Sequence, residues 1–133
     1  MTGAPRVLTL LPDRLAICRF APDLPPPAWV FHAESRFYSV TRTVEELSVV
    51  TAEDDLPPAA WDTARRGWRA FRLEGPVPFE LTGVIAGLTA PLAAAGVPVF
   101  VLSTWDTDLV LVEEAHLATA RAALAAAGYE VRG

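Results

Sequence analysis

The stretch VPVFVLSTWDTDLVLV, which occupies residues 97–112, decides the fold. It places a β-branched and aromatic run at 97–103 before a polar turn at 104–108 and a second apolar run at 109–112. Strand-forming residues on both sides of a turn rich in Thr and Asp predict a β-hairpin with one buried face. The segments on either side of this hairpin must then supply the elements that cover it.

An Ala- and Leu-rich helix is predicted on each side of the hairpin. The first runs from Thr82, expected as its N-cap, to Gly96 in the C-terminal cap position. The second starts at Glu113 and Glu114, where negative charge suits the helix dipole, and ends at Gly128. Outer strands are expected at 68–73 and 129–132. The predicted order is βαββαβ, and the similar helix ends at 91–97 and 123–129 support it.

The first half of the chain has a related but less regular pattern. Two strands are expected around the turn 11–14, and a second hairpin from 37–43 and 47–51. The proline run at 22–27 permits at most a short helix, near 28–31. We therefore predict two units, 1–66 and 67–133, with a further short helix in 57–65.

Composition excludes several classes of protein. The chain has 133 residues, of which 52% are hydrophobic, and a net charge of −5, so it can bury a core and is poorly suited to nucleic acid. The apolar segment 84–102 is interrupted by Gly and Pro, so we expect no membrane span. No secretory signal is visible, which makes a cytoplasmic location the expectation. Cys18, without a second Cys, is expected to be a buried thiol.

The chain resembles small bacterial tandem ACT-domain proteins, which are similar to the ACT modules of aspartate kinases and of the cytosolic arginine sensors. The segments that carry the resemblance are FYSVT at 37–41, FELTGVIA at 79–86, AAGVPVF at 94–100 and STWDTD at 103–108. The resemblance implies an α+β fold of two ferredoxin-like βαββαβ units, the first with a shortened first helix. It also implies an amino-acid-binding regulatory module, and we expect homo-oligomers.

The resemblance implies an effector site where the helix-start loop of one unit faces the other unit. The chemistry agrees, because N–H groups in the first turn of a helix suit an α-carboxylate. Asp106, and less strongly Asp108, can accept hydrogen bonds from an amino group or a cationic side chain, which slightly favours a polar or basic amino acid. Trp105 is either a cover of the turn or a lid on the site, and we expect it to pack. The candidate ligand-binding residues are Ser39, Val40, Leu81, Thr82, Gly83, Val84, Ile85, Thr104, Asp106 and Asp108.

Each of these residues also has a purely structural interpretation, since every helix has a start and Asp is common in turns. One alternative function is an assembly module with a degenerate pocket. A second is a small Mg²⁺-dependent enzyme using Asp106 and Asp108, although no phosphate loop or nucleophile motif is visible. His32 and His116 stand alone, so we expect no metal or cofactor. We predict a non-catalytic sensor whose downstream protein the sequence does not identify.

Overall fold

The computed structural model describes residues 5–31 and 36–133 of the chain. They form two compact units, one from residues 13–68 and the other from residues 5–12 together with 69–133. We call these the 13–68 unit and the split unit. The expected boundary between residues 66 and 67 is close to this division, but residues 5–12 belong with the C-terminal half and not with the N-terminal half.

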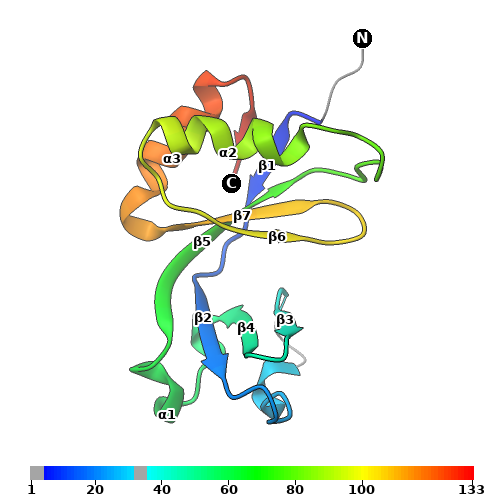
Figure 1. The fold of residues 1–133 in the computed structure, drawn as a ribbon. Coiled ribbons are helices and arrows are strands. Elements are labelled where there is room, and N and C mark those ends of the chain that lie inside the picture. Colours follow the sequence, from blue (N-terminus) through cyan, green and yellow to red (C-terminus); the bar gives the residue numbers. More distant parts are fainter. Residues whose placement is uncertain (1–4, 32–35) are drawn as a thin grey trace. The chain divides into compact units, whose positions relative to one another are not determined.

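The split unit contains a mixed sheet covered by two helices (Figure 1). Its strand order is β6–β7–β5–β1–β8. The predicted βαββαβ order is confirmed, with β5 beginning in the 13–68 unit and continuing here. The elements in chain order are β5 (Arg65–Leu73), α2 (Val84–Ala94), β6 (Phe100–Ser103), β7 (Asp108–Glu113), α3 (Leu117–Ala126) and β8 (Glu130–Arg132), preceded by β1 (Val7–Leu10).

Strand β1 lies between the first and last strands of this βαββαβ unit. Leu8 pairs with Leu73 of β5 in antiparallel register and with Val131 of β8 in parallel register. The expected pairing of residues 6–11 with 14–20 around a turn is therefore wrong. Leu8 and Leu10 are 0% and 7% exposed, because they enter the core of the split unit. Strand β1 pairs with β5 and β8 because this pairing buries Leu8 and Leu10 in the core of the split unit. Pro12 and Asp13, expected in a hairpin turn, lie in the link between β1 and β2.

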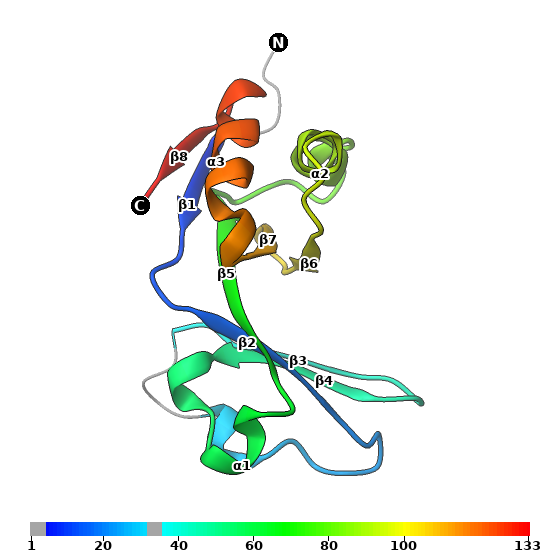
Figure 2. The same cartoon turned by 90° about the vertical axis from the view of Figure 1, so that its left-hand side faces the viewer.

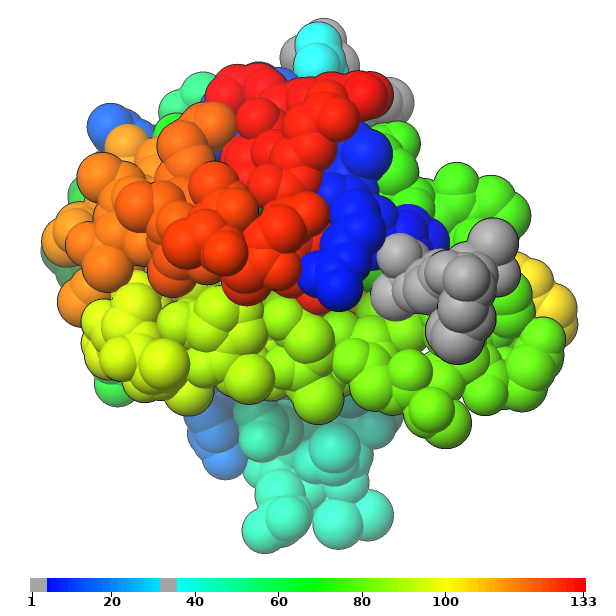
Figure 3. Space-filling view, turned by 90° about the horizontal axis from the view of Figure 1, so that it is seen from above, coloured from blue at the N-terminus to red at the C-terminus, as the bar shows by residue number. Residues whose placement is uncertain are grey.

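The helices α2 and α3 bury their apolar stripes against the sheet and contact each other (Figures 2 and 3). Leu88 and Leu92 of α2 and Leu124 of α3 are at most 1% exposed and share one core with Phe71. Their spacing follows the helical period, so one face of each helix points inward. Within the described residues, no helix is both long enough and apolar enough to cross a membrane.

The two helices end in the same way, as the internal similarity predicts. Gly96 and Gly128 both have positive φ, and the residue after each donates its N–H to a carbonyl in the last turn. The predicted start of α2 is wrong by one residue, because Gly83 and not Thr82 is the N-cap. Gly83 has a φ of 80°, so the chain enters α2 through a left-handed conformation that favours glycine.

The 13–68 unit forms a sheet in the order β3–β4–β2–β5. Its strands β2 (Leu15–Phe20), β3 (Ser39–Arg42) and β4 (Leu47–Ala52) are antiparallel, and the predicted hairpin of β3 with β4 is confirmed. The first helix is reduced to a 3₁₀ turn, η1 (Ala28–Phe31), after the proline run, and α1 (Pro58–Trp61) is short. Cys18 is buried as expected. The expected α+β fold with a shortened first helix is thus confirmed.

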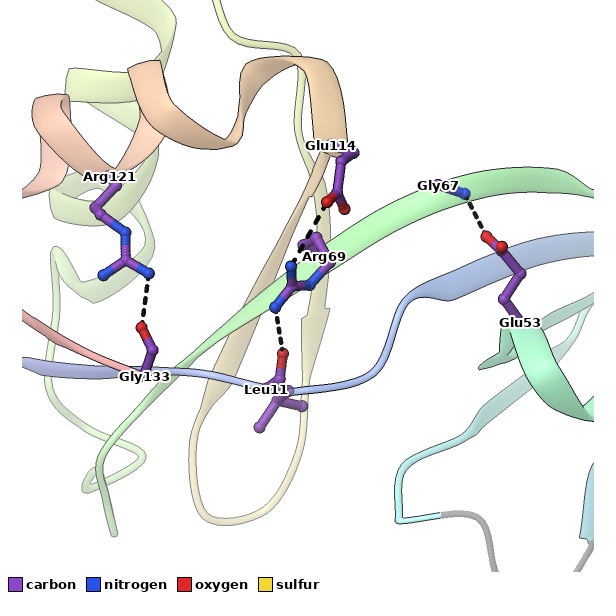
Figure 4. Close-up of polar contacts among 7 residues, drawn as sticks. All are labelled: Leu11, Glu53, Gly67, Arg69, Glu114, Arg121 and Gly133. Carbon is purple, nitrogen blue, oxygen red and sulfur yellow. Dashed lines mark hydrogen bonds and ion pairs between the residues drawn. The ribbon is translucent and has the colours of Figure 1, made fainter.

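Polar contacts fix the ends of the strands within each unit (Figure 4). In the split unit, Arg69 donates to the carbonyl of Leu11 at 3.1 Å and pairs with Glu114 at 3.7 Å. In the 13–68 unit, the N–H of Gly67 donates to Glu53 Oε2 at 2.8 Å. Arg69 is mostly buried, so its bond to Leu11 holds the end of β1 against β5.

Candidate functional site

A pocket of about 370 Å³ opens in the split unit where the start of α2 meets the β6–β7 turn. In Figure 1 the loop before α2 and this turn lie on the same side of the unit. We call it the helix-start pocket. Its lining residues are Val77, Pro78, Phe79, Leu81, Gly83, Val84, Ile85, Ala86, Ser103, Thr104, Trp105, Thr107 and Asp108. All of them belong to the split unit.

The first turn of α2 gives the pocket its hydrogen-bond donors. The first intrahelical bond runs from the N–H of Gly87 to the carbonyl of Gly83. The N–H groups of the four residues 83–86 precede it and have no acceptor inside the helix. These four residues all line the pocket, at the positive end of the helix dipole. This edge of the pocket therefore suits a carboxylate.

Among the residues that the structure describes, Asp108 is the one lining residue of this pocket with a charged side chain. It is the first residue of β7 and lies directly across from Ser103, the last residue of β6. The hydroxyl of Ser103 donates to Asp108 Oδ1 at 2.6 Å, which orients the carboxylate. The second oxygen of the carboxylate can still accept hydrogen bonds. A carboxylate that shares a small pocket with helix N–H groups can hold the ammonium group of a zwitterion.

The β6–β7 turn is fixed to the end of β5 by hydrogen bonds. Thr107 Oγ1 donates to the carbonyl of Leu73 at 2.6 Å, and the N–H of Val77 donates to the carbonyl of Asp106 at 2.6 Å. Gly75 permits this approach, because a Cβ there would lie 2.8 Å from the Asp106 carbonyl oxygen. The turn side of the pocket is thus already held in place by the chain itself.

An exposed aromatic pair, Phe79 and Trp105, lines both this pocket and a second hollow. Their ring centroids are 4.7 Å apart in an edge-to-face arrangement, and the two residues are 68% and 79% exposed. The second hollow has a volume of about 380 Å³ and contains Glu80 and Asp106. We call it the adjoining hollow. The expectation that Trp105 packs is wrong, because most of its surface is open to solvent even though its ring contacts that of Phe79.

The structure brings together most, but not all, of the candidate residues from the sequence. Those that line the helix-start pocket are Leu81, Gly83, Val84, Ile85, Thr104 and Asp108. Asp106 lines the adjoining hollow, Thr82 lines neither, and Ser39 and Val40 lie in β3 of the 13–68 unit. Sequence reasoning missed the contribution of Val77, Phe79 and Ser103. Little in the sequence indicates a binding role for these residues, because GPVPF at 75–79 predicts only a loop and Ser103 only the end of a strand.

The described residues contain no group of three His, Cys, Asp or Glu side chains that could hold a metal ion. His32 lies outside the described residues, and His116 ends η3 (Glu114–His116). The helix-start pocket offers hydrogen bonding, with N–H donors from the first turn of α2 and the carboxylate of Asp108 among its lining residues. This fold and this pocket define a small ligand-binding module.

Comparison with known proteins identifies the family of this module. Residues 63–126 match the family model described as ACT domain, and this part of the chain belongs to that family. A model that describes an N-terminal domain matches residues 13–59. The chain is 31% identical over 91 residues to the cytosolic arginine sensor for mTORC1 subunit 1 of Bos taurus, an alignment that covers 62% of this chain. The chain spans only 28% of that protein's length.

Solved structures extend the likeness to nearly the whole chain. A crystal structure of an Agobacterium tumefaciens protein has a TM-score of 0.85 and 35% identity, covering 96% of this chain and 93% of that one. The regulatory subunit of aspartate kinase from Thermus thermophilus has a TM-score of 0.61 at 15% identity, covering 87% and 93%. The second likeness concerns the fold alone. Together, the ACT match and the sensor relative support a ligand-binding regulatory role.

Proposed function

We propose that the chain senses a free amino acid and that the helix-start pocket binds its α-carboxylate and α-ammonium groups. The observation that carries this proposal is that residues 83–86 and Asp108 line one and the same pocket. Four N–H groups at a helix start complement the carboxylate, and the oriented Asp108 complements the ammonium. An analogue of the amino acid that lacks either the carboxylate or the ammonium group could satisfy only one of these two partners.

A free amino acid as the ligand class is supported by the bovine relative, which is named as an arginine sensor. Ser39 and Val40, which the family resemblance also implies as ligand contacts, belong to the 13–68 unit and stay a prediction. We also propose that the module self-associates and that it acts on another protein without catalysing a reaction. If the protein exists in two conformations, the amino acid can shift their populations only to the extent that it binds one conformation more tightly than the other.

A thermal-shift screen of the twenty amino acids, followed by calorimetric titration of the hits, tests the proposal. A ligand that binds the native state raises the melting temperature, and we expect one site per chain. A flat screen would favour an assembly role, and turnover that depends on Mg²⁺ would favour an enzyme.

Two matched variants assign the acidic group. Asp108→Asn keeps the shape and the Ser103 bond but removes the charge, so we expect affinity for the hit to fall about tenfold to a hundredfold. Asp106→Asn removes the same charge from the adjoining hollow, and we expect it to change the affinity by less than about threefold. The reverse order would reassign the ammonium to Asp106.

A further inference from the structure

The walls of the helix-start pocket differ sharply in polarity. Apart from Asp108, no lining residue among those that the structure describes carries a charged side chain. The polar groups that can bind a zwitterion are the backbone N–H groups of residues 83–86 and the carboxylate of Asp108. Ser103, Thr104 and Thr107 add uncharged hydroxyl groups, and the large apolar side chains of the lining are Val77, Pro78, Phe79, Leu81, Ile85 and Trp105.

This distribution of charge limits the side chain that the ligand can carry. In the proposed function, the α-ammonium group pairs with the carboxylate of Asp108, and the α-carboxylate accepts hydrogen bonds from the N–H groups at the start of α2. No opposite charge is then left in the pocket for a basic side chain, and no basic residue is present for an acidic one. A charged side chain would lose water there without gaining a partner.

The aromatic pair provides apolar surface that such a ligand can cover. Phe79 and Trp105 are 68% and 79% exposed, and Ile85 in the first turn of α2 is 36% exposed. Large apolar side chains gathered on one exposed patch mark a site of interaction. Covering them with a flat or branched hydrocarbon group removes apolar surface from water on both partners.

We infer that the effector is an amino acid with an apolar side chain, aliphatic or aromatic, which packs against Phe79, Trp105 and Ile85. This inference rests on the proposed function and narrows it. It departs from the preference for polar or basic ligands that the acidic turn suggests in the sequence. The reason is positional, because Glu80 and Asp106 line the adjoining hollow instead of the helix-start pocket.

Norleucine and lysine form a matched pair of probes, since lysine is norleucine with a terminal ammonium group. Calorimetric titration of the full chain with each should give norleucine at least about tenfold tighter binding, because its whole side chain can be buried. Tighter binding of lysine would overturn the inference and leave the proposed function standing. It would indicate that the cationic end reaches Glu80 and Asp106. Absence of binding by any of the twenty amino acids would overturn both.

A variant pair locates the side-chain contact. Trp105→Ala should weaken norleucine binding about fivefold or more while leaving glycine binding unchanged, because glycine uses only the two polar edges. Trp105 is 79% exposed, so its removal should not disturb the fold, and circular dichroism checks this. Trp61→Ala, which removes a partly exposed Trp of the 13–68 unit, is the control. Unchanged norleucine binding in Trp105→Ala would overturn the inference.

Discussion

Gly87 in α2 offers a sharp test of how the split unit is packed. A Cβ at this position would lie 2.8 Å from Tyr129 Oη, closer than side-chain atoms normally approach. Tyr129 is 7% exposed, with the guanidinium of Arg6 5.0 Å from its ring centroid, so the phenol has little room to move. Gly87→Ala should gain about 1 kcal/mol from helix propensity and lose about 1–3 kcal/mol from overpacking. We expect net destabilisation of about 1 kcal/mol.

The control is the same substitution in a Tyr129→Phe background, which removes the oxygen that the new methyl group would meet. There Gly87→Ala should stabilise the protein by up to about 1 kcal/mol, which gives a coupling energy of about 2 kcal/mol between the two sites. Urea denaturation followed by circular dichroism measures the free energy of unfolding of all four proteins. If Gly87→Ala stabilises both backgrounds equally, the contact between α2 and Tyr129 does not exist as described.

Three further outcomes follow from local contacts. Hydrogen bonds from Thr9 and Arg72 lower the pKa of Glu74, so the stability it contributes is present above pH 4.5 and is lost as the pH falls below that value. The free energy of unfolding should therefore fall less with decreasing pH in the Glu74→Gln variant than in the unsubstituted protein, as measured by denaturation at a series of pH values. Burial raises the pKa of the Cys18 thiol, so a disulfide reagent should label it only when the protein unfolds. Thr107→Val removes the bond to the carbonyl at the end of β5 and should cost about 1 kcal/mol in chemical denaturation.

The sequence predicted the elements that depend on local pattern. The hairpin at 97–112, the two Ala-rich helices and their glycine ends are encoded within short segments, because periodicity and positive φ are local properties. Thr82 shows the limit of such reasoning. A hydroxyl before an apolar run resembles an N-cap, yet the path of the incoming chain required a left-handed residue, and only Gly83 adopts that conformation without strain.

The sequence predicted only part of the candidate site. It drew attention to the helix start and to the acidic turn, since both have a chemical signature in short motifs. It ranked Asp106 above Asp108, but in the structure Asp108 lines the same pocket as the helix start and Asp106 lines the adjoining hollow. Asp108 begins β7 and pairs with Ser103, whereas Asp106 lies in the turn before that strand, so the path of the folded turn decides which hollow each carboxylate lines.

By itself, the sequence determined the βαββαβ order of the C-terminal half, the shortened helix of the first half and the two segments that meet at the pocket. Only the tertiary structure decided that β1 joins β5 and β8, and that Phe79 and Trp105 form one exposed wall. Local pattern fixes which residues are apolar and what conformation each segment adopts. The partner of a strand or an aromatic ring is decided by which distant surface buries it, and that choice depends on the whole chain.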